Sequence, residues 1–356
     1  MDDDKKSSLS CSCASGYDTT SFIDLTHNKL VSELRTVTGK LTLNDRFDHF
    51  LARWGMNRMG HIVKPGLYKM GRPNADSPVL VSANYTLSFD AVRSALAGTD
   101  CYILVLDTKG VNVWCAAGKG TFGTEELVHR IAWSGLSSIV SHRNLILPQL
   151  GAPGISAHEV QRRSGFRVEY GPVRASDLPE YIKTRKATPE MRRVQFSFKD
   201  RLVLTPVELV HVALPTLVAA IILYLLTGPL AALAAITAVL AGTVFFPALL
   251  PIIPTHDLST KGLILGVIFA IPFAISFAAN PIMPLWTDLL KSLVPLLIMP
   301  ALTAYLALNF TGCTTFTSRT GVKKEIYRYV PVMVLMAGSG ILILVLLGAI
   351  WLMEVI

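Results

Sequence analysis

Hydrophobic positions follow two different patterns along the chain. Between about residues 38 and 183, short apolar runs alternate with amphipathic stretches. Beyond residue 206, apolar residues dominate in long segments. The first pattern is typical of strands alternating with helices, and the second of helices that span a membrane. The sequence therefore predicts an α/β domain followed by an all-α transmembrane domain.

In the first part, four apolar runs predict buried strands and four intervening stretches predict helices. The strands are expected at 77–83, 101–107, 144–148 and 166–170, and the helices at roughly 89–97, 124–134, 157–164 and 177–183. Continuous apolar runs of this length are typical of parallel strands that are covered on both faces. We therefore expect a Rossmann-like domain whose ligand lies beyond the carboxyl ends of the strands.

The second part contains five apolar segments, each long enough to cross a hydrocarbon layer of about 30 Å. They lie at about 207–226, 229–253, 262–279, 289–310 and 330–353, within a transmembrane domain of residues 207–356. Residues 1–37 carry charges and no apolar run, which predicts a flexible leader and no cleavable signal peptide. Residues 184–206 read as a basic connector.

Composition and charge agree with this division. The chain is 51% hydrophobic and only 16% charged, whereas soluble domains carry about a quarter charged residues. Of its 33 Lys and Arg residues, 27 precede residue 207, and four more (Arg319, Lys323, Lys324 and Arg328) fill the predicted loop before the last span. Basic residues stay on the cytoplasmic side. We therefore expect a multi-pass protein of the inner membrane, with a cytoplasmic N-terminal domain and an outside C-terminus.

These basic residues are explained by topology and by contact with membrane lipid, so we expect no nucleic acid partner. Five scattered cysteines exclude a disulfide framework.

The segment 107–120 is the most informative for function, because it follows a predicted buried strand and so lies at the edge of the sheet where ligands bind. Asn112 is a favourable helix N-cap, which would place Cys115 at the third helical position, where the helix dipole favours a thiolate. Ala116, Ala117 and Gly118 would leave the surface beside the sulfur bare, and Lys119 adds positive charge. The alternative is that Cys115 is simply a small buried residue. The glycine spacing does not match a Walker phosphate loop. Gly118, Gly120 and Gly123 match a GxGxxG pattern, but the pattern follows Cys115 instead of following the strand directly, so it is a weak signal.

Four segments resemble one known family. The sequence NVWCAAGK at 112–119 closely resembles the cap-helix motif of the membrane-anchored corrinoid protein of microbial mercury methylation. Segments 79–90 and 147–155 are similar to other parts of that corrinoid domain, and 309–325 is similar to the loop before its last span. Domain order and the five spans agree. The resemblance implies a corrinoid-binding domain similar to that of the corrinoid iron–sulfur protein.

The resemblance also implies a reaction and a site. The function it implies is transfer of a methyl group from a methyl-Co(III) corrinoid of the cobalamin type to Hg(II), forming methylmercury. Cys115 would be the catalytic residue and the lower axial ligand of cobalt. A thiolate donates more electron density than imidazole, which would suit methyl transfer to a thiophilic metal ion. The cofactor-binding residues would be Asn112, Val113, Trp114, Cys115, Ala116, Ala117, Gly118, Lys119, Ser82, Asn84, Thr86, Gln149, Ala152 and Gly154.

For some of these residues an ordinary structural role stays open. Trp114 either packs or contacts the ring. Ser82, Asn84 and Thr86 follow the first predicted strand, where turn chemistry would also explain them.

Two missing motifs bear on the cofactor and its partners. None of the eight histidines has an Asp two residues before it, as the histidine motif of other corrinoid methyltransferases requires, so Cys115 is the available lower ligand. No CxxC motif occurs either, so the chain cannot build its own four-thiolate cluster. Electrons must then come from a partner, which the resemblance implies is a ferredoxin-like iron–sulfur protein. It also implies a methyltetrahydrofolate-type methyl donor. Cys11 and Cys13 would either handle Hg(II) or belong to a flexible tail.

Two other functions stay open. The first is a corrinoid methyl carrier that acts on a different acceptor, because the same cofactor chemistry would serve both. The second is a transporter or receptor with a cytoplasmic α/β domain. That function would require a phosphate loop or spaced charges within the spans, and the sequence has neither.

Overall fold

The structure is a computed structural model that describes residues 34–57, 60–279, 285–310 and 319–355. The chain forms two compact units. One comprises Met59–Arg192 together with the N-terminal stretch to Leu43, and the other comprises Arg193–Ile356 together with Asn44–Arg58. The first is an α/β unit and the second is helical, as the hydrophobic pattern predicts.

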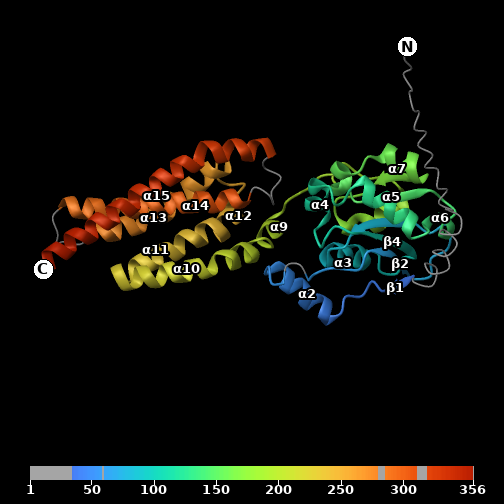
Figure 1. The fold of residues 1–356 in the computed structure, drawn as a ribbon, viewed down its shortest axis with the longest axis horizontal. Helices are drawn as coiled ribbons and strands as arrows, with labels where there is room; N and C mark the ends of the chain where they lie inside the picture. The colour runs from blue at the N-terminus through green and yellow to red at the C-terminus, as the bar shows by residue number, and fades with distance from the viewer. Residues whose placement is uncertain (1–33, 58–59, 280–284, 311–318, 356) are drawn as a thin grey trace, which may run out of the picture. The chain divides into compact units, whose positions relative to one another are not determined.

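The α/β unit is built on a six-stranded sheet (Figure 1). Its strands are β1 (Arg35–Val37), β2 (Gly66–Met70), β3 (Val79–Ala83), β4 (Cys101–Leu106), β5 (Asn144–Leu147) and β6 (Arg167–Tyr170), in the order β1-β2-β4-β3-β5-β6. Strands β3 to β6 run parallel, whereas β2 is antiparallel to β4 and pairs with β1 on its other side. The four predicted strands are confirmed, and β1 and β2 are additional.

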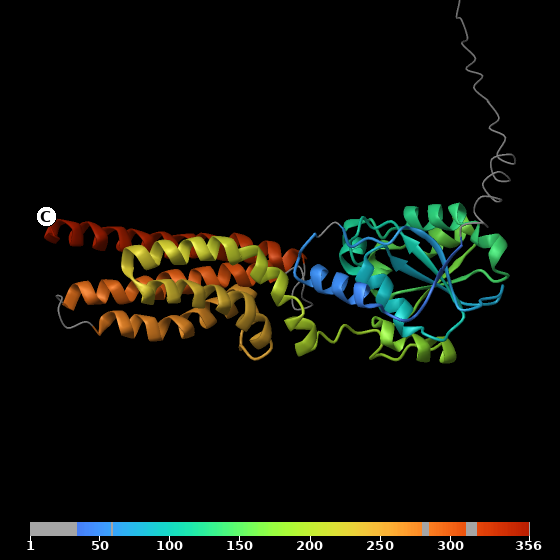
Figure 2. The same ribbon diagram turned by 90° about the horizontal axis from the view of Figure 1, so that it is seen from below.

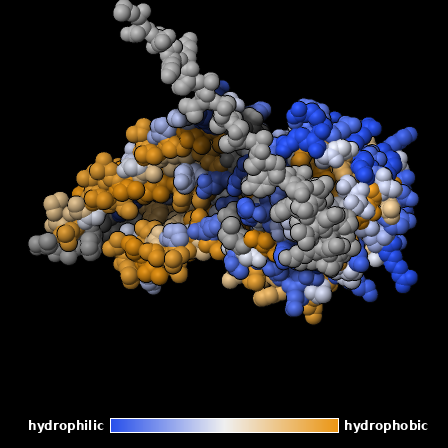
Figure 3. Space-filling model, turned by 45° about the vertical axis from the view of Figure 1, so that its right-hand side comes forward, coloured by the Kyte–Doolittle hydropathy of each residue, from blue (hydrophilic) through white to orange (hydrophobic). Residues whose placement is uncertain are grey.

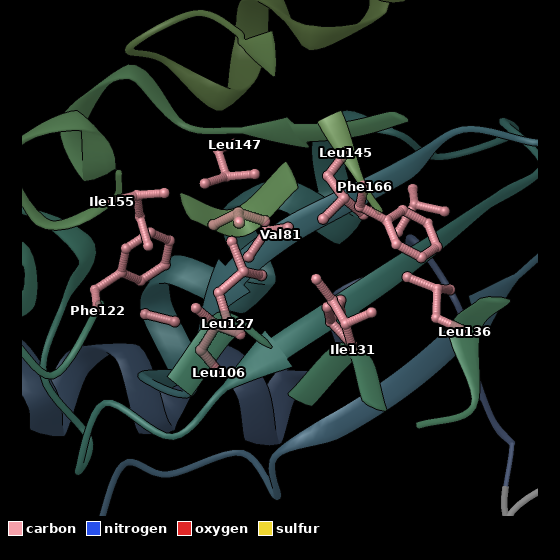
Figure 4. Close-up of a cluster of buried hydrophobic side chains, with 14 of the residues drawn as sticks. Val81, Leu106, Phe122, Leu127, Ile131, Leu136, Leu145, Leu147, Ile155 and Phe166 are labelled. Atoms are coloured by element: carbon pink, nitrogen blue, oxygen red, sulfur yellow. The ribbon is translucent and has the colours of Figure 1, made fainter. Parts of the chain in front are cut away.

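Helices cover both faces of this sheet. They are α3 (Thr86–Ala95), α4 (Val113–Lys119), α5 (Thr124–Trp133), α6 (Leu136–Ile139), α7 (Ala157–Ser164) and α8 (Leu178–Thr184), with 3-10 turns η1 (Gln149–Gly154) and η2 (Ala175–Asp177). One core contains Val81, Leu106, Leu127, Ile131 and Phe166, as Figure 4 shows. The other is formed by alternate strand residues, with side chains from α3 and α8. Burial on both faces explains why β3 and β4 are apolar throughout.

The strand order determines where a ligand can bind. The chain passes from β3 to β4 on one side of β3 and returns to β5 on the other side. In open α/β sheets, ligands bind beyond the carboxyl ends of the strands, where the connections diverge in this way. Residues after β3, β4 and β5 meet at this edge, which is also where most of the expected site residues lie.

The helical unit contains five helices that are long and apolar enough to cross a membrane (Figure 2). They are α10 (Thr205–Thr227, preceded by α9, Phe198–Leu202), α11 (Pro229–Leu240, continued through η3, Ala241–Phe245, and α12, Phe246–Leu249), α13 (Leu258–Ala278), α14 (Leu285–Asn309) and α15 (Arg319–Val355). Figure 3 shows apolar side chains gathered over these helices. The remaining helix, α2 (Leu43–Arg53), lies between β1 and β2 in the sequence, and from Asn44 on it belongs to the helical unit.

The prediction of a basic loop before the last span is wrong. Arg319, Lys323, Lys324 and Arg328 lie in the first turns of α15, which begins at Arg319. Lys and Arg are good helix formers, so their charge did not stop the helix. Glu325 of the same segment is buried and accepts hydrogen bonds from the backbone N and the Oγ of Ser259, at 3.0 and 2.9 Å. These bonds tie the start of α15 to the start of α13.

Close helix contacts hold the bundle together. A Cβ atom added to Gly262 of α13 would lie 2.6 Å from the Cα of Ala304 in α14. Small residues allow two helices to approach each other this closely. The helical unit is therefore built as a packed bundle, and α10 contributes least to its interior.

Candidate functional site

The connection from β4 to α4 is a tight turn at the carboxyl edge of the sheet. Lys109 and Gly110 both have positive φ, 58° and 69°. A non-glycine residue in this region is uncommon, so other groups must stabilise the turn. The Thr108 hydroxyl donates to the carbonyl oxygen of Val111 at 2.7 Å. The main support comes from β3, through Asn84.

Asn84 is almost fully buried and is the centre of this turn. Its Oδ1 accepts hydrogen bonds from the backbone N of Thr108 and of Gly110, both at 3.0 Å. It also lies 2.8 Å from the Thr108 hydroxyl, whose single proton it shares with the Val111 carbonyl oxygen. Its Nδ2 donates to Asp107 Oδ1 at 3.2 Å. One side chain from the end of β3 therefore determines the backbone path after β4.

Ser82 and Asn84, two of the expected cofactor-binding residues, both have buried side chains. Ser82 is 1% exposed and its hydroxyl lies 3.4 Å from the carbonyl oxygen of Ala83. Asn84 uses its amide within the protein. Ser82 is covered because β3 is buried along its whole length, and Asn84, directly after that strand, is 2% exposed. Thr86, by contrast, is half-buried at the start of α3.

Cys115 lies on α4 as the sequence predicts. Asn112 is the N-cap, and its Oδ1 accepts a hydrogen bond from the backbone N of Cys115 at 2.9 Å. Cys115 is the third residue of the helix and its thiol is half-buried. Trp114 is 43% exposed, and Gly118 and Lys119 are also exposed. Cys115 is therefore partly exposed on a helix whose Trp114, Gly118 and Lys119 are also exposed.

Ala116 and Ala117 do not form the bare face beside the sulfur that their sequence suggests. They are 0% and 6% exposed and, with Val113, belong to the core beneath α4. Their small size serves a different contact: a Cβ atom on Gly154 of η1 would lie 3.1 Å from the Cα of Ala117. The loop after β5 can approach α4 closely because these residues are small.

The remaining expected residues lie on that loop. Gln149, Ala152 and Gly154 are half-buried in η1, which packs against α4. The Oε1 of Gln149 accepts a hydrogen bond from Arg192 at 2.7 Å. The fold thus brings the segments after β3, β4 and β5 together, with Trp114, Gly118 and Lys119 exposed and Cys115 half-buried.

Asp107, Glu126 and Lys109 form a charged group that the sequence analysis missed. Asp107 donates its backbone N–H to Glu126 at 2.8 Å, and its carboxylate pairs with the Lys109 ammonium at 2.6 Å. Burial raises the pKa of the Asp107 carboxyl, but hydrogen bonds from Lys109 and the charges of Lys109 and Arg130 outweigh this effect, so the net pKa is lowered. The position of Asp107 directly after a buried strand was the available signal.

This lowered pKa predicts a pH-dependent turn. A carboxyl with a depressed folded-state pKa stabilises the fold above its unfolded pKa of about 3.9, and that contribution is lost as the pH falls through the folded value. We expect amides of 107–112 to lose protection below about pH 4, measured by hydrogen exchange corrected for its intrinsic pH dependence. Asp107→Asn should remove this dependence, while amides of β6 should respond alike in both proteins. An unchanged pH response in Asp107→Asn would contradict the role of Asp107.

The N-cap of α4 gives a second prediction. Asn112→Ala should destabilise α4 by about 1 kcal/mol, because the Cys115 N–H loses its acceptor. Amides of 113–119 should then exchange roughly fivefold faster. Asn112→Ser should restore most of the protection, because serine is also a good N-cap. Equal exchange in the alanine and serine variants would show that the cap contributes nothing.

Among the described residues, no group of three or more His, Cys, Asp and Glu side chains could hold a metal ion. A single thiol such as Cys115 suits a metal that brings most of its own ligands. Cys101, the other cysteine in the described part, is fully buried, and burial with nearby Asp100 raises its pKa to about 12. Cys11, Cys13 and Cys313 lie outside the described residues.

The α/β region is similar to one known protein family and to several curated proteins. Residues 57–182 match the model of the family described as CO dehydrogenase/acetyl-CoA synthase delta subunit (CdhD). Among curated proteins, the gamma subunit of the acetyl-CoA decarbonylase/synthase complex of Methanopyrus kandleri is 36% identical over 123 residues, 34% of this chain and 26% of that protein. The gamma subunit of Methanothermobacter thermautotrophicus is 32% identical over 127 residues, 35% of this chain and 27% of that protein.

The gamma 2 subunit of Methanosarcina mazei is 33% identical over 121 residues, covering 33% of this chain and 25% of that protein. The chain thus spans about a quarter of the length of these relatives.

These matches correct the family expected from the cap-helix motif. The assignment to mercury methylation, with Hg(II) as substrate and methylmercury as product, is wrong, because the matching family and the relatives all belong to acetyl-CoA chemistry. The relatives are subunits of an enzyme complex. Residues 57–182 are therefore similar to the delta-subunit family of CO dehydrogenase/acetyl-CoA synthase and to gamma subunits of acetyl-CoA decarbonylase/synthase complexes.

Proposed function

We propose that the α/β unit binds a corrinoid and serves as a methyl-carrying subunit in an enzyme system of the acetyl-CoA decarbonylase/synthase type. The observation that carries this proposal is the accessible thiol of Cys115 on a capped helix at the carboxyl edge of the sheet. This helix lies inside the region that matches the CO dehydrogenase/acetyl-CoA synthase family.

The residues present fit a corrinoid. Such a cofactor brings most of the ligands of its metal and would need one donor from the protein beside an open surface. Cys115 supplies a thiol that is half-buried, so it is held in place and still accessible. Trp114 and Gly118 supply exposed surface next to it. When bound, the corrinoid supplies a cobalt ion that can accept a methyl group and pass it on.

In this proposal the residues of the protein hold and orient the cofactor. Cys115 would hold the cobalt from one side, and a thiolate is the form that binds a metal. Asn112 orients the helix end by accepting the Cys115 N–H, and Asn84 holds the preceding turn. Thr86, Gln149, Ala152 and the exposed Lys119 would contact the periphery of the cofactor from the neighbouring segments. A rigid support of this kind reduces the cost of keeping the axial ligand in place.

The chain requires partners for this role. Its sequence has no CxxC motif, so we propose a separate ferredoxin-like iron–sulfur protein as electron donor and a methyltetrahydrofolate-type methyl donor. The relatives act as subunits of a complex, which supports a role with protein partners.

We also propose that the five apolar helices anchor this unit in the cytoplasmic membrane. Arg192, Arg193, Lys199 and Arg201 precede α10, and more basic residues lie at the start of α15. By the positive-inside rule this charge supports a cytoplasmic location for the α/β unit. The anchor would keep the methyl carrier close to membrane-bound partners.

A direct test uses the purified full-length protein. Under anaerobic conditions it is mixed with cobalamin, freed of excess cofactor, and its cobalt content and visible spectrum are measured. We expect one corrinoid per chain, and labelled methyl groups from methyltetrahydrofolate should appear on the protein when a methyltransferase and a low-potential reductant are added. Absence of bound corrinoid in folded protein would refute the proposal.

A further inference from the structure

The helix α2 exposes its apolar residues and partly covers its polar ones. Leu43, Phe47 and Phe50 are 82%, 62% and 50% exposed. Residues at i, i+4 and i+7 share one side of a helix. In a protein surrounded by water, this side of an amphipathic helix would face the core, yet none of the residues of α2 is fully buried.

The opposite side of α2 is polar and half-buried. Asp45, Asp48 and His49 all have intermediate exposure, although their side chains are those that water solvates best. At about 100° per residue, these three positions lie together across the helix from Phe47 and Phe50. The helix is therefore oriented with its polar side toward the protein and its apolar side outward, so an apolar medium must cover the outward side.

The outward side has the charge pattern of a helix at a membrane surface. Arg46 and Arg53 are exposed and lie seven residues apart, on the same edge of the apolar face. Arginine stems can lie along apolar surface while the guanidinium reaches lipid phosphates. Trp54 follows the helix and packs against Phe50, with ring centroids 5.5 Å apart and the rings tilted by 39°. Aromatic rings next to basic residues are typical of helices that lie in the interface.

The position of α2 within its unit points to the same partner. Gly55, two residues after the helix, packs against Val207 near the start of α10, and a Cβ there would lie 2.9 Å from a Val207 methyl. Helix α10 is an apolar candidate span, and Phe198 of the adjoining α9 is also exposed. The exposed face of α2 thus belongs to the same unit as a span and lies near the end where that span begins.

We infer that α2 lies in the membrane–water interface, with Leu43, Phe47 and Phe50 inserted among lipid acyl chains and Arg46 and Arg53 at anionic headgroups. This inference rests on the proposed membrane anchor. It makes α2 a second contact with the bilayer, close to the point where the α/β unit joins the first span. A protein partner or a second copy of the chain on this face is the alternative that the experiment tests.

The test places a tryptophan on either side of α2 in the full-length protein. Phe47→Trp adds it to the outward face, and His49→Trp adds it to the half-buried side as a matched control. Each variant is reconstituted into phosphatidylethanolamine–phosphatidylglycerol vesicles, with or without phospholipids brominated near the headgroup. Fluorescence of the added tryptophan is obtained by difference from the unmodified protein. We expect bromine to quench at least half of the signal at position 47 and little of that at 49.

Vesicle flotation separates the two proposals. If the protein does not float with the vesicles, the membrane anchor itself is refuted. If it floats but the tryptophan at 47 is quenched by aqueous iodide and not by brominated lipid, the anchor stands and the inference about α2 is overturned. Shielding of that tryptophan from both quenchers would assign the face to a protein, either a partner or a second copy, and would also overturn it.

Discussion

Replacing Cys115 with alanine should abolish thiolate-ligated corrinoid binding and leave the fold unchanged. The side chain is half-buried on α4, and alanine is the best helix former, so stability should change by no more than about 0.5 kcal/mol. Loss of the axial donor should weaken corrinoid affinity by at least roughly a hundredfold. Cobalt content and the visible spectrum after anaerobic reconstitution measure this effect directly.

Two further variants make this test specific. Cys101→Ala removes the other cysteine in the described part of the chain, which is fully buried with a pKa near 12 and unsuited to bind a metal, so its spectrum should match that of the unmodified protein. Cys115→His offers nitrogen in place of sulfur, so it should retain cobalt with a shifted spectrum. If Cys115→Ala keeps the original spectrum, the axial ligand is another residue.

The strands that could be predicted most clearly from the sequence are those buried at every position. Strands β3 and β4 are buried along their whole length, so their continuous apolar runs were clear signals. Strand β1 has three residues, and β2 contains Lys69, so neither stands out from its surroundings. The N-cap at Asn112 was predictable because capping depends on residues only three positions apart.

Roles that depend on distant partners were not predictable in this way. Ala116 and Ala117 appeared to line a cofactor face, but the packing of η1 explains their size. In α2, the spacing of Leu43, Phe47 and Phe50 was present in the sequence, yet only the structure shows which side faces outward. The error about mercury has a related cause: a short cap-helix motif describes how a cofactor is held, not the acceptor of its methyl group.

Asn84 makes its hydrogen bonds within the protein, and replacing it should disturb the site more than replacing any other residue that would not contact the cofactor. In Asn84→Ala, the backbone N–H groups of Thr108 and Gly110 lose their acceptor, and Asp107 loses a donor. At about 1 kcal/mol for each bond, the turn should be destabilised by about 3 kcal/mol. Amides of 107–112 should exchange roughly a hundredfold faster, and corrinoid affinity should fall because Cys115 is no longer held in place.

Matched variants separate this role from a general loss of stability. Asn84→Asp keeps an oxygen acceptor for Thr108 and Gly110 but places a second carboxylate beside Asp107, so its effect should be intermediate and should shrink as the pH falls. Asn144→Ala changes an exposed asparagine at the start of β5 and should alter exchange little. If Asn84→Ala exchanges no faster than Asn144→Ala, the turn is held by its own backbone. The buried amide would then have no part in positioning Cys115.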